Sequence, residues 1–521
     1  MKNRKIESAW AYHNDTKHSY ESIRRNPHYL DWENQPMPFK IYSDLPAIPL
    51  PADLSSSGVP ALSALSAVPS SGHSEARLTK KMLAEILFLS AGVTRRRSYP
   101  GGEILFRAAA CTGALYHIDL YVACDELEDL PAGVYHFSPH DFALRRLREG
   151  DYRSVLASAS GQEPSIGSAS CVIVSASTYW RNAWKYQSRA YRHCYWDNGT
   201  LLANLLAAAA ARDVPAKVIT GFVDNLVNQI VSLDTQREAA LSLVALGHVP
   251  AQNVIAAAAV EPLTLKTAPL SKEEIDYPAM RAMHESSSLE NEDEVKAWRD
   301  EKATQSANLT EESGKQQQLF SLQPLNDEAM PQDTLEDVVI RRGSTRQFSQ
   351  TSISFEQLST MLDRATRGIP ADFLPEPQGT LNDLYLIVHA VDGLPPGAYV
   401  YRRDKQALEL LKEGDFRRDA GHLGLGQEIP ADCSVNVYFL ADLNRILQRF
   451  GNRGYRAAQL EAAIMGGKLY LAAYAQRLGA SGLTFFDDDV TEFFSPHAAG
   501  KSVMFLIALG KSAKRKGLNV V

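Results

Sequence analysis

The chain of 521 residues is 45% hydrophobic and 22% charged, a composition typical of folded globular domains. Its net charge of −7 and its pI near 6.0 give no basic field that would favour nucleic acid or an anionic membrane surface. The five cysteines include no CxxC pair and no Cys/His cluster, which argues against a disulfide framework or a metal site. We therefore expect a cytoplasmic enzyme without a bound metal, a nucleic-acid partner or a membrane anchor.

Residues 1–75 are predicted to form an N-terminal arm followed by a loose segment. Residues 34–51 carry five prolines, so we expect them to run extended along the surface. Residues 55–74 are rich in Ser, Ala and Pro and should be loosely ordered. The arm is expected to dock on the body of the protein, because it carries several aromatic side chains: Trp10, Tyr12, Tyr29, Trp32 and Phe39.

An internal repeat sets the organisation of the remaining chain. Residues 147–153, LREGDYR, return as residues 411–417, LKEGDFR, at an offset of 264. The same offset aligns residues 131–135 with 395–399, residues 189–192 with 453–456, and Asp224 with Asp488. A unit of this length is a domain, because the units of solenoid repeats have only about 20–50 residues. We assign domain 1 to residues 76–262 and domain 2 to residues 334–521.

Each domain is predicted to be α+β, with a mixed sheet covered by helices. β-Branched and aromatic runs predict buried strands, and a long stretch of small apolar residues predicts a central packed helix. The expected elements, for domain 1 and then domain 2, are a first strand (117–122, 384–388), a second strand (134–137, 398–401), a central helix (198–212, 460–478) and a closing strand (241–246, 503–509).

Residues 263–333 are predicted to be a linker between the domains. The stretch 272–333 is rich in Glu, Ser and Gln and poor in β-branched residues, so it should bury little apolar surface. We expect it to lie on the surface, partly helical or disordered.

The segment Arg341-Arg-Gly-Ser-Thr-Arg346 is the strongest candidate binding motif, and it stands just ahead of a predicted helix at residues 354–362. Its three guanidiniums and the Ser344 hydroxyl suit a phosphate dianion, because the planar fork of arginine donors matches pairs of phosphate oxygens. For this motif alone, the alternative is a solvated basic turn.

This segment resembles the FMN phosphate motif of the nitroreductase superfamily, and the whole chain resembles the SagB/ThcOx-type dehydrogenases of that superfamily. The other matching pieces are Ala110-Cys-Thr-Gly-Ala-Leu-Tyr116, Lys185-Tyr186-x-x-Arg189-x-Tyr-Arg192, the Gly-x-Tyr turn and the N-terminal segments 12–18 and 31–36. The resemblance implies two tandem nitroreductase-like, FMN-dependent domains that form a single-chain pseudo-dimer, with flavin at the seam between them. The chain would then be a monomer or pair further as a homodimer.

The resemblance also implies which residues hold the flavin. One subunit of the superfamily's dimer supplies the arginine cradle, and the other supplies the loop under the flavin ring. Here domain 2 would supply Arg341, Arg342, Ser344 and Arg346, together with Leu483, Thr484 and Phe485 at the ring edge. Domain 1 would supply Ala110, Cys111, Thr112 and Gly113. Cys111 is expected to be a loop residue and not a nucleophile, because no histidine accompanies it in a catalytic motif.

Lys185 and Tyr186 are the candidate catalytic residues. In SagB-type dehydrogenases this pair is associated with removal of a substrate proton, and oxidation of a thiazoline or oxazoline requires a base beside the flavin. The alternative is a structural pair that contacts solvent at the start of a helix.

Three functions fit these residues. The first is a dehydrogenase that transfers hydride between flavin N5 and a small-molecule or peptide-derived heterocycle. The second is an NAD(P)H-dependent nitro or quinone reductase, and the third is a non-catalytic flavin-binding scaffold. Lys185 and Tyr186 favour the first over the second, because a reductase needs no substrate base. We expect no leader-peptide module, which argues against a peptide substrate. NAD(P)H or O2 is the expected redox partner.

Only one of the two possible seam sites is expected to bind flavin. At the second site the roles of the domains reverse, and residues 61–70, which contain no arginine, stand in the cradle position. Residues 375–379 replace the ring loop with a proline-containing stretch, and Arg449 and Phe450 replace Lys185 and Tyr186. We therefore predict one FMN per chain.

Overall fold

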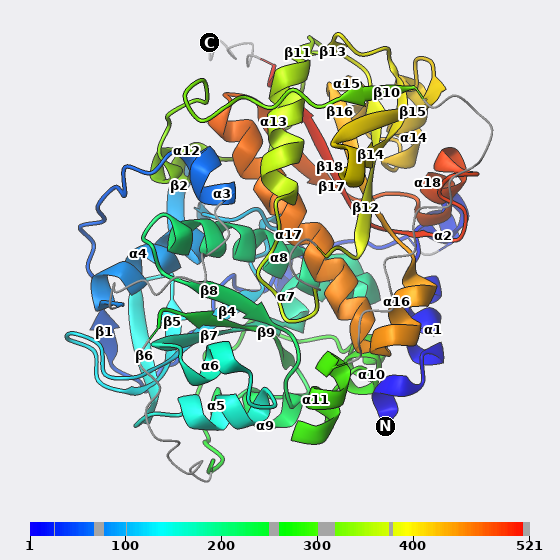
Figure 1. Cartoon of the computed structure of the whole chain (residues 1–521). Helices are drawn as coiled ribbons and strands as arrows, with labels where there is room; N and C mark the ends of the chain where they lie inside the picture. The colour runs from blue at the N-terminus through cyan, green and yellow to red at the C-terminus, as the bar shows by residue number, and fades with distance from the viewer. Residues whose placement is uncertain are drawn as a thin grey trace.

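The structure is a computed structural model of the chain and describes residues 1–25, 27–66, 78–99, 102–248, 260–300, 318–374 and 379–513. Two seven-stranded sheets with corresponding strand orders form the two domains (Figure 1). In domain 1 the order is β1 (Ala47–Pro49), β6 (Ala143–Glu149), β5 (Gly133–Ser138), β4 (Ile118–Cys124), β7 (Cys171–Thr178), β9 (Glu238–Leu246) and β8 (Ala216–Ile219). In domain 2 it is β10 (Leu319–Ser321), β15 (Ala407–Glu413), β14 (Gly397–Arg402), β12 (Asn382–Val388), β16 (Val435–Ala441), β18 (Ser502–Gly510) and β17 (Gly479–Leu483).

Both sheets are antiparallel, so the prediction of a mixed sheet is wrong. Every neighbouring pair of strands in the two large sheets runs antiparallel. The physical reason lies in the connections, because strands joined by the short Pro/Gly turns after β4 and β12 can pair only as hairpins. The expected strands themselves, and the α+β class, are confirmed.

The helices repeat in the same order in the two halves of the chain. In the first half they are α1 (Glu7–Asp15), α2 (Tyr20–Arg25), α3 (Ala61–Ser66), α4 (Lys80–Ala91), α5 (Arg153–Ala159), α6 (Pro164–Gly167), α7 (Tyr179–Tyr186), α8 (Ala190–Ala210) and α9 (Asp224–Ile230). In the second half they are α10 (Pro278–Ser286), α11 (Glu292–Asp300), α12 (Leu335–Arg341), α13 (Phe355–Thr366), α14 (Arg417–Leu423), α15 (Glu428–Asp432), α16 (Leu443–Phe450), α17 (Arg453–Ala475) and α18 (Asp487–Phe494).

The two long helices α8 and α17 lie between the sheets and pack directly on each other (Figure 1). Glycines allow this close approach, because a Cβ on Gly199 would lie 2.5 Å from Cβ of Ala463, and one on Gly467 would lie 2.6 Å from Cβ of Ala203. The predicted central helices are thus present, but both begin earlier in the chain than expected. Their first turns carry buried arginines, whose polar character hid the helix starts from the sequence.

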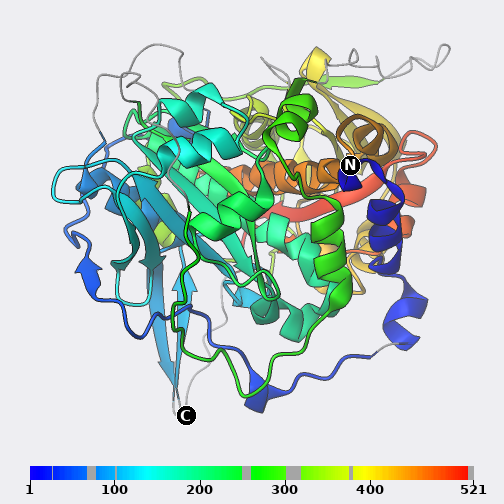
Figure 2. The ribbon, with the colours of Figure 1, turned by 90° about the horizontal axis from the view of Figure 1, so that it is seen from below.

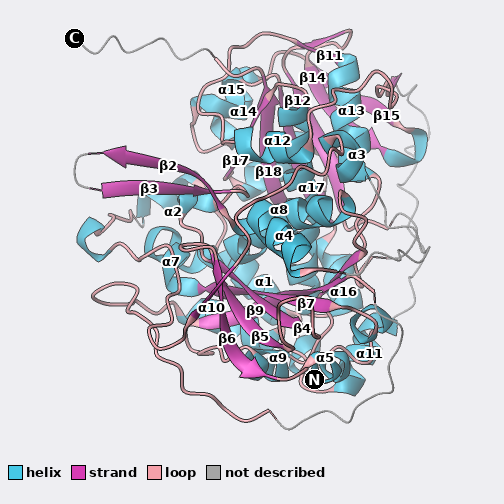
Figure 3. Ribbon diagram, turned by 90° about the vertical axis from the view of Figure 1, so that its left-hand side faces the viewer, coloured by secondary structure: helices cyan, strands magenta, loops and turns pink. Residues whose placement is uncertain are grey.

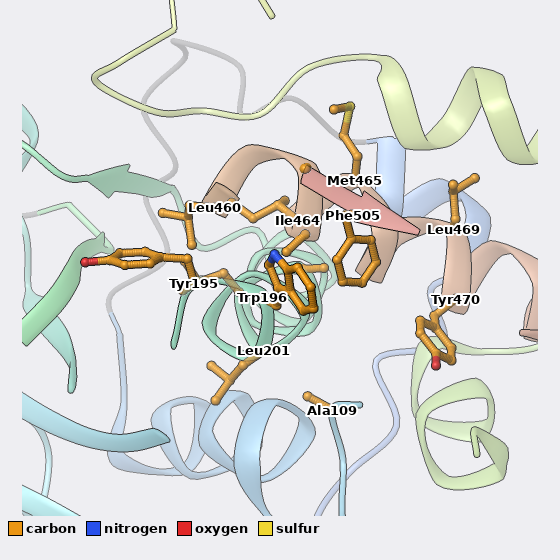
Figure 4. Close-up of a cluster of buried hydrophobic side chains, with 14 of the residues drawn as sticks. Ala109, Tyr195, Trp196, Leu201, Leu460, Ile464, Met465, Leu469, Tyr470 and Phe505 are labelled. Carbon is orange, nitrogen blue, oxygen red and sulfur yellow. The ribbon is translucent and has the colours of Figure 1, made fainter. Parts of the chain in front are cut away.

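The apolar core is continuous across the seam. Figure 4 shows Trp196 of α8 beside Phe505 of β18, with Ile464 and Leu460 of α17 near them. The Trp196 indole N–H also donates to Oε1 of Gln459, 2.5 Å away on α17. One cluster of buried side chains therefore draws on both sheets, whereas a second cluster lies within the first half of the chain.

The segment expected to be a surface linker is a second copy of the N-terminal arm. Arg192 donates to the carbonyl oxygen of His13, 2.7 Å away in α1, and Arg456 donates to that of His284, 2.6 Å away in α10. The arm lies along the C-terminal elements of domain 2 (Figure 2), whereas α10 packs on domain 1. Trp298 of α11 is only 1% exposed, so this polar segment buries more than its composition predicts.

The β2–β3 hairpin is an addition to the first half. Strands β2 (Val93–Tyr99) and β3 (Gly102–Arg107) follow α4 and project from the body of the molecule (Figure 3). The corresponding connection from α13 to β12 is shorter, and its described residues form no such hairpin. Within the described parts of the chain, no helix has both the length and the apolar character needed to cross a membrane.

Candidate functional site

Two aspartates, one in each domain, form buried ion pairs with arginines of the other domain. Asp487 of domain 2 accepts from Arg189 and Arg192 of domain 1 at 2.9 and 2.6 Å, and all three side chains are buried. In the mirrored arrangement, Asp224 accepts from Arg453 and Arg456 at 2.6 and 2.7 Å. The geometry thus gives these four arginines a structural role as ion-pair partners.

The aspartate in domain 2 differs from the sequence expectation. The counterpart of Asp224 is Asp487 and not Asp488, because domain 2 has one residue fewer in the turn before α18. Asp487 is buried, with only 2% of its surface exposed. Burial alone would raise the pKa of each aspartate, but the paired guanidiniums outweigh burial and hold the pKa well below its usual range.

The predicted ring loop of domain 1 is held by one carboxylate on α8. Asp197 accepts from the backbone N–H and the hydroxyl of Thr112 at 2.8 and 2.7 Å, from the Cys111 thiol at 3.0 Å and from His117 Nε2 at 2.8 Å. Cys111, His117 and Asp197 lie close enough to suit a metal ion, but this carboxylate already has four donors. We interpret the cluster as the support of the loop.

Cys111 has the character expected of a loop residue. Burial, followed by the nearby charge of Asp197, raises the pKa of its thiol well above the ordinary value. The thiol therefore stays protonated at neutral pH, donates to Asp197 and is a poor nucleophile.

Tyr186 lies against the ring loop, at the end of α7. Gly113 has a φ of 64°, which favours glycine, and a Cβ there would meet the Tyr186 hydroxyl at 2.9 Å. The Tyr186 ring packs edge-on against His193 at 4.5 Å between centroids. Burial is the main cause that raises the pKa of Tyr186, and the negative charge of Asp197 adds to it, while the positive charge of Arg346 opposes this rise.

Lys185 is half-buried beside Tyr186, with its Nζ 5.5 Å from the centre of the tyrosine ring. Both residues occupy the last turn of α7, so the alternative that placed them at a helix start is wrong.

The arginine segment of domain 2 divides into paired and unpaired guanidiniums. Arg342 is buried, and it donates to the backbone oxygens of Ala108 and Arg107 in domain 1 at 2.8 and 3.1 Å. Arg346 is exposed. Among the described residues no carboxylate pairs with Arg342 or Arg346. Arg341, by contrast, is turned toward Asp333, with which it forms an ion pair of 2.6 Å, so the structure does not bring it to the other two.

The remaining predicted residues also face this seam. The Ser344 hydroxyl lies 3.3 Å from that of Tyr470 on α17, and Tyr470 in turn accepts from the N–H of Gly482 at 2.5 Å. Leu483 ends β17, and Thr484 and the buried Phe485 follow it in the chain. In domain 1, the carbonyl oxygen of Ala110 accepts from Thr200 at 2.7 Å.

Comparisons with known proteins place this geometry in a family. Residues 339–511 match the Nitroreductase family. The crystal structure of a predicted nitroreductase from Anabaena variabilis has a TM-score of 0.74 at 26% identity, and the match covers 97% of this chain and 99% of that chain. The family match thus covers domain 2, and the fold of the whole chain is similar to that of the Anabaena variabilis protein.

Two further relatives match over shorter stretches. MJ1384 of Methanocaldococcus jannaschii, named as a predicted nitroreductase, is 26% identical over 156 residues, which are 30% of this chain and 75% of that protein. The trifolitoxin-processing protein TfxB of Rhizobium leguminosarum bv. trifolii is 26% identical over 181 residues, which are 33% of this chain and 48% of that protein. The match with TfxB thus spans about half of the length of that relative.

The first seam is the one between the ring loop of domain 1 and the arginine segment of domain 2, and its polar groups suit a ligand that carries a phosphate. Buried polar atoms there lack a hydrogen-bond partner among the described residues, namely Thr484 Oγ1 and His193 Nε2. The guanidiniums of Arg342 and Arg346 lack a counter-ion in the described parts of the chain. Buried polar groups are rarely left unpaired in native structures, so these groups are suited to receive polar atoms from a ligand.

The second seam is filled by the chain itself. Trp298 packs on Phe450, with ring centroids 5.3 Å apart, and its indole N–H donates to the carbonyl oxygen of Phe450 at 3.1 Å. The same indole lies 2.9 Å from where a Cβ of Gly221 would be. Asp372 accepts from the backbone N–H groups of Thr220 and Gly221, both at 2.8 Å.

Part of the sequence argument about this second seam falls outside the described residues. Residues 67–70 of the stretch in the cradle position and residues 375–378 of the substitute ring loop are not described. Sequence reasoning missed Asp197, Trp298 and Asp372. Asp197 and its domain 2 counterpart Glu461 stand at the 264-residue offset, and Glu461 likewise accepts from Thr380 and Leu381, so the repeat contained a signal for the carboxylate.

Proposed function

We propose that the protein is an FMN-dependent oxidoreductase with a single flavin site at the first seam, and that it acts as a SagB-type dehydrogenase. One observation carries the proposal. The arginine segment of domain 2 reaches domain 1 just ahead of the ring loop, because Arg342 donates to the backbone oxygens of Arg107 and Ala108, and Tyr186 lies against that loop at Gly113.

The residues of the seam have distinct roles in holding FMN. Arg342, Ser344 and Arg346 would bind its phosphate, because arginine and hydroxyl donors match the oxygens of a phosphate monoester. Cys111, Thr112 and Gly113 would lie under the ring, and Leu483 to Phe485 would hold its polar edge. Arg341 would contribute only weakly to phosphate binding, because Asp333 pairs with its guanidinium and balances its charge. FMN when bound supplies a two-electron acceptor and donor of hydride.

Lys185 is the proposed base and Tyr186 the proposed donor. Because the pKa of Tyr186 is raised, its phenol stays protonated at neutral pH and can donate a hydrogen bond to substrate. A proton taken from a substrate carbon at this place then goes to the Lys185 amine, which is the neighbouring group able to accept it.

The substrate class is proposed from a relative. TfxB is named as a processing protein of trifolitoxin, and this likeness supports a peptide-derived or other small azoline as substrate. NAD(P)H or O2 would be the redox partner.

Purified protein reconstituted with flavin tests the cofactor. We expect one flavin per chain that is released as FMN, because the arginine segment suits a terminal monophosphate. Release of FAD, or no retained flavin, would contradict the proposal.

A Lys185→Ala variant tests the proposed chemistry. It should bind FMN normally and oxidise an azoline substrate roughly 10²–10⁴-fold more slowly, as loss of a general base typically does. Lys217→Ala, which removes a lysine paired with Glu163 on the far edge of domain 1, is the control. Unchanged oxidation by Lys185→Ala, with rapid reduction of a nitro compound by NAD(P)H, would favour the reductase. No turnover of either kind by wild-type protein would favour a flavin-binding scaffold.

A further inference from the structure

The β2–β3 hairpin carries an arginine to the phosphate end of the proposed site. A Cβ on Gly343, in the middle of the arginine segment, would lie 3.8 Å from Nη2 of Arg95. Arg95 is on β2 of domain 1, and Gly343 belongs to domain 2. The hairpin thus reaches across the seam to the residues proposed to hold the flavin phosphate.

The base of the hairpin is fixed in this position by Arg342. The Arg342 side chain donates to the carbonyl oxygens of Arg107, which ends β3, and of the following Ala108. On the facing strand, Arg95 pairs with Phe106 in the register, and its guanidinium lies 4.8 Å from the centre of the Phe106 ring. Arg95 is therefore oriented by a packed aromatic ring and by a strand that Arg342 anchors.

The charges around this point are unbalanced. Arg95 and Arg342 are close enough for the positive charge of Arg95 to contribute to lowering the pKa of Arg342, although burial is the larger cause. Within the described residues, no carboxylate forms an ion pair with Arg95, Arg342 or Arg346, whereas Arg341 and Arg477 share Asp333. Holding like charges close together costs electrostatic energy, and a bound anion would offset this cost.

We propose that Arg95 is a cross-domain ligand of the flavin phosphate, so that the hairpin and the arginine segment bind one phosphate monoester between them. This inference rests on the proposed function. It adds a residue from the half of the chain that was expected to supply only the ring loop and the catalytic pair. It also gives the hairpin a role at the first seam that the second half, with its shorter connection, cannot reproduce.

The test compares FMN with riboflavin, which has the same ring and no phosphate. Apo-protein is titrated with each flavin while the quenching of flavin fluorescence is followed. Arg95→Gln should weaken FMN binding about tenfold, the size expected for one exposed charge-assisted hydrogen bond, and should leave riboflavin binding unchanged. Arg96→Gln is the matched control, because Arg96 is the adjacent hairpin arginine and pairs with Glu103 at 3.4 Å.

The outcomes separate this inference from the proposed function. If wild-type protein binds neither flavin, the proposed function fails. If wild-type protein binds FMN and Arg95→Gln binds it equally well, the role of Arg95 is wrong while the proposed function stands. Equal weakening of FMN and riboflavin, or unchanged FMN affinity with a raised KM for NADPH, would also overturn the phosphate role.

Discussion

The two seams between the domains have the same backbone plan and different contents. At the first, Tyr186 stands at the end of α7 beside Gly113, and buried polar atoms such as Thr484 Oγ1 lack a partner among the described residues. At the second, Phe450 stands at the corresponding end of α16, and Trp298 covers it. The turn that corresponds to Thr484 donates its N–H groups to Asp372.

This difference shows how a duplicated domain can lose one site and keep its fold. A seam that no longer binds a ligand would contain an apolar gap and unpaired donors, and both are destabilising. Trp298 fills the gap, and Asp372 pairs with the donors. At the first seam, Thr484 Oγ1 and His193 Nε2 remain without a partner among the described residues, as the proposed binding of a ligand there requires.

Removing the arginines of the first seam should have the largest effect. Arg342→Ala/Arg346→Ala removes two charge-assisted contacts to the phosphate, each worth about 1.5–3 kcal/mol. FMN affinity should therefore fall by roughly 10²–10⁴-fold, as measured by flavin retention after gel filtration and by fluorescence titration. Arg402→Ala, which breaks the ion pair with Glu409 inside domain 2, is the control for loss of a buried arginine. A double variant that still holds one flavin per chain would show that the flavin is bound elsewhere.

Replacing either aspartate of the reciprocal ion pairs should destabilise the fold, but only one of the two replacements should also change flavin binding. Asp487→Asn and Asp224→Asn each leave two buried guanidiniums without their carboxylate, at a cost of about 3–5 kcal/mol, measurable by urea denaturation. Only Asp487→Asn should also weaken FMN binding, because Arg189 packs 5.3 Å from the centre of the Phe485 ring at the first seam. Equal flavin affinity in the two variants would contradict this link.

The same aspartates predict an acid dependence of stability. Their pKa values are lowered in the folded state by the paired arginines, whereas an unfolded aspartate has a pKa of about 3.9. A carboxyl with a lowered pKa stabilises the fold above its unfolded pKa, and this stabilisation is lost as the pH falls through the folded value. The free energy of unfolding should therefore decrease below about pH 4, and it should decrease less in either Asn variant.

The sequence predicted the two domains, most of their central strands and the candidate residues of the first seam. The 264-residue register identified the seam arginines, and the absence of arginine from residues 61–70 predicted that the second seam lacks a phosphate cradle. Trp298 was missed because one tryptophan in a polar stretch has no periodicity, and its burial depends on a distant surface. The second copy of the arm was missed because its register differs, with His284 and Ser287 in the places of His13 and Thr16.

Removing the indole that fills the second seam should lower stability and leave flavin binding unchanged. Trp298→Ala should cost about 3–5 kcal/mol, as truncation of a buried tryptophan does, and FMN should remain at one per chain. Trp32→Ala is the matched control, because Trp32 follows α2 in the first copy of the arm and is 66% exposed; it should change stability by less than about 0.5 kcal/mol. Added indole should partly restore the thermal stability of Trp298→Ala alone. A second equivalent of FMN in that variant would mean that the indole, and not a lost cradle, excludes flavin.

The smallest expected effect concerns Arg341, which the motif alone does not distinguish from Arg342. Its guanidinium forms an ion pair with Asp333 and donates to the carbonyl oxygen of Tyr474 at 2.9 Å, so its charge is already balanced. A neutralised guanidinium that does not point to the phosphate contributes only through a screened field, which is worth about 1 kcal/mol or less near a surface. Arg341→Ala should therefore weaken FMN binding less than about fivefold, well below the effect of Arg342→Ala in the same titration. If the two single variants lose FMN equally, Arg341 leaves Asp333 when flavin binds, and the division of the arginine segment into paired and unpaired members is wrong.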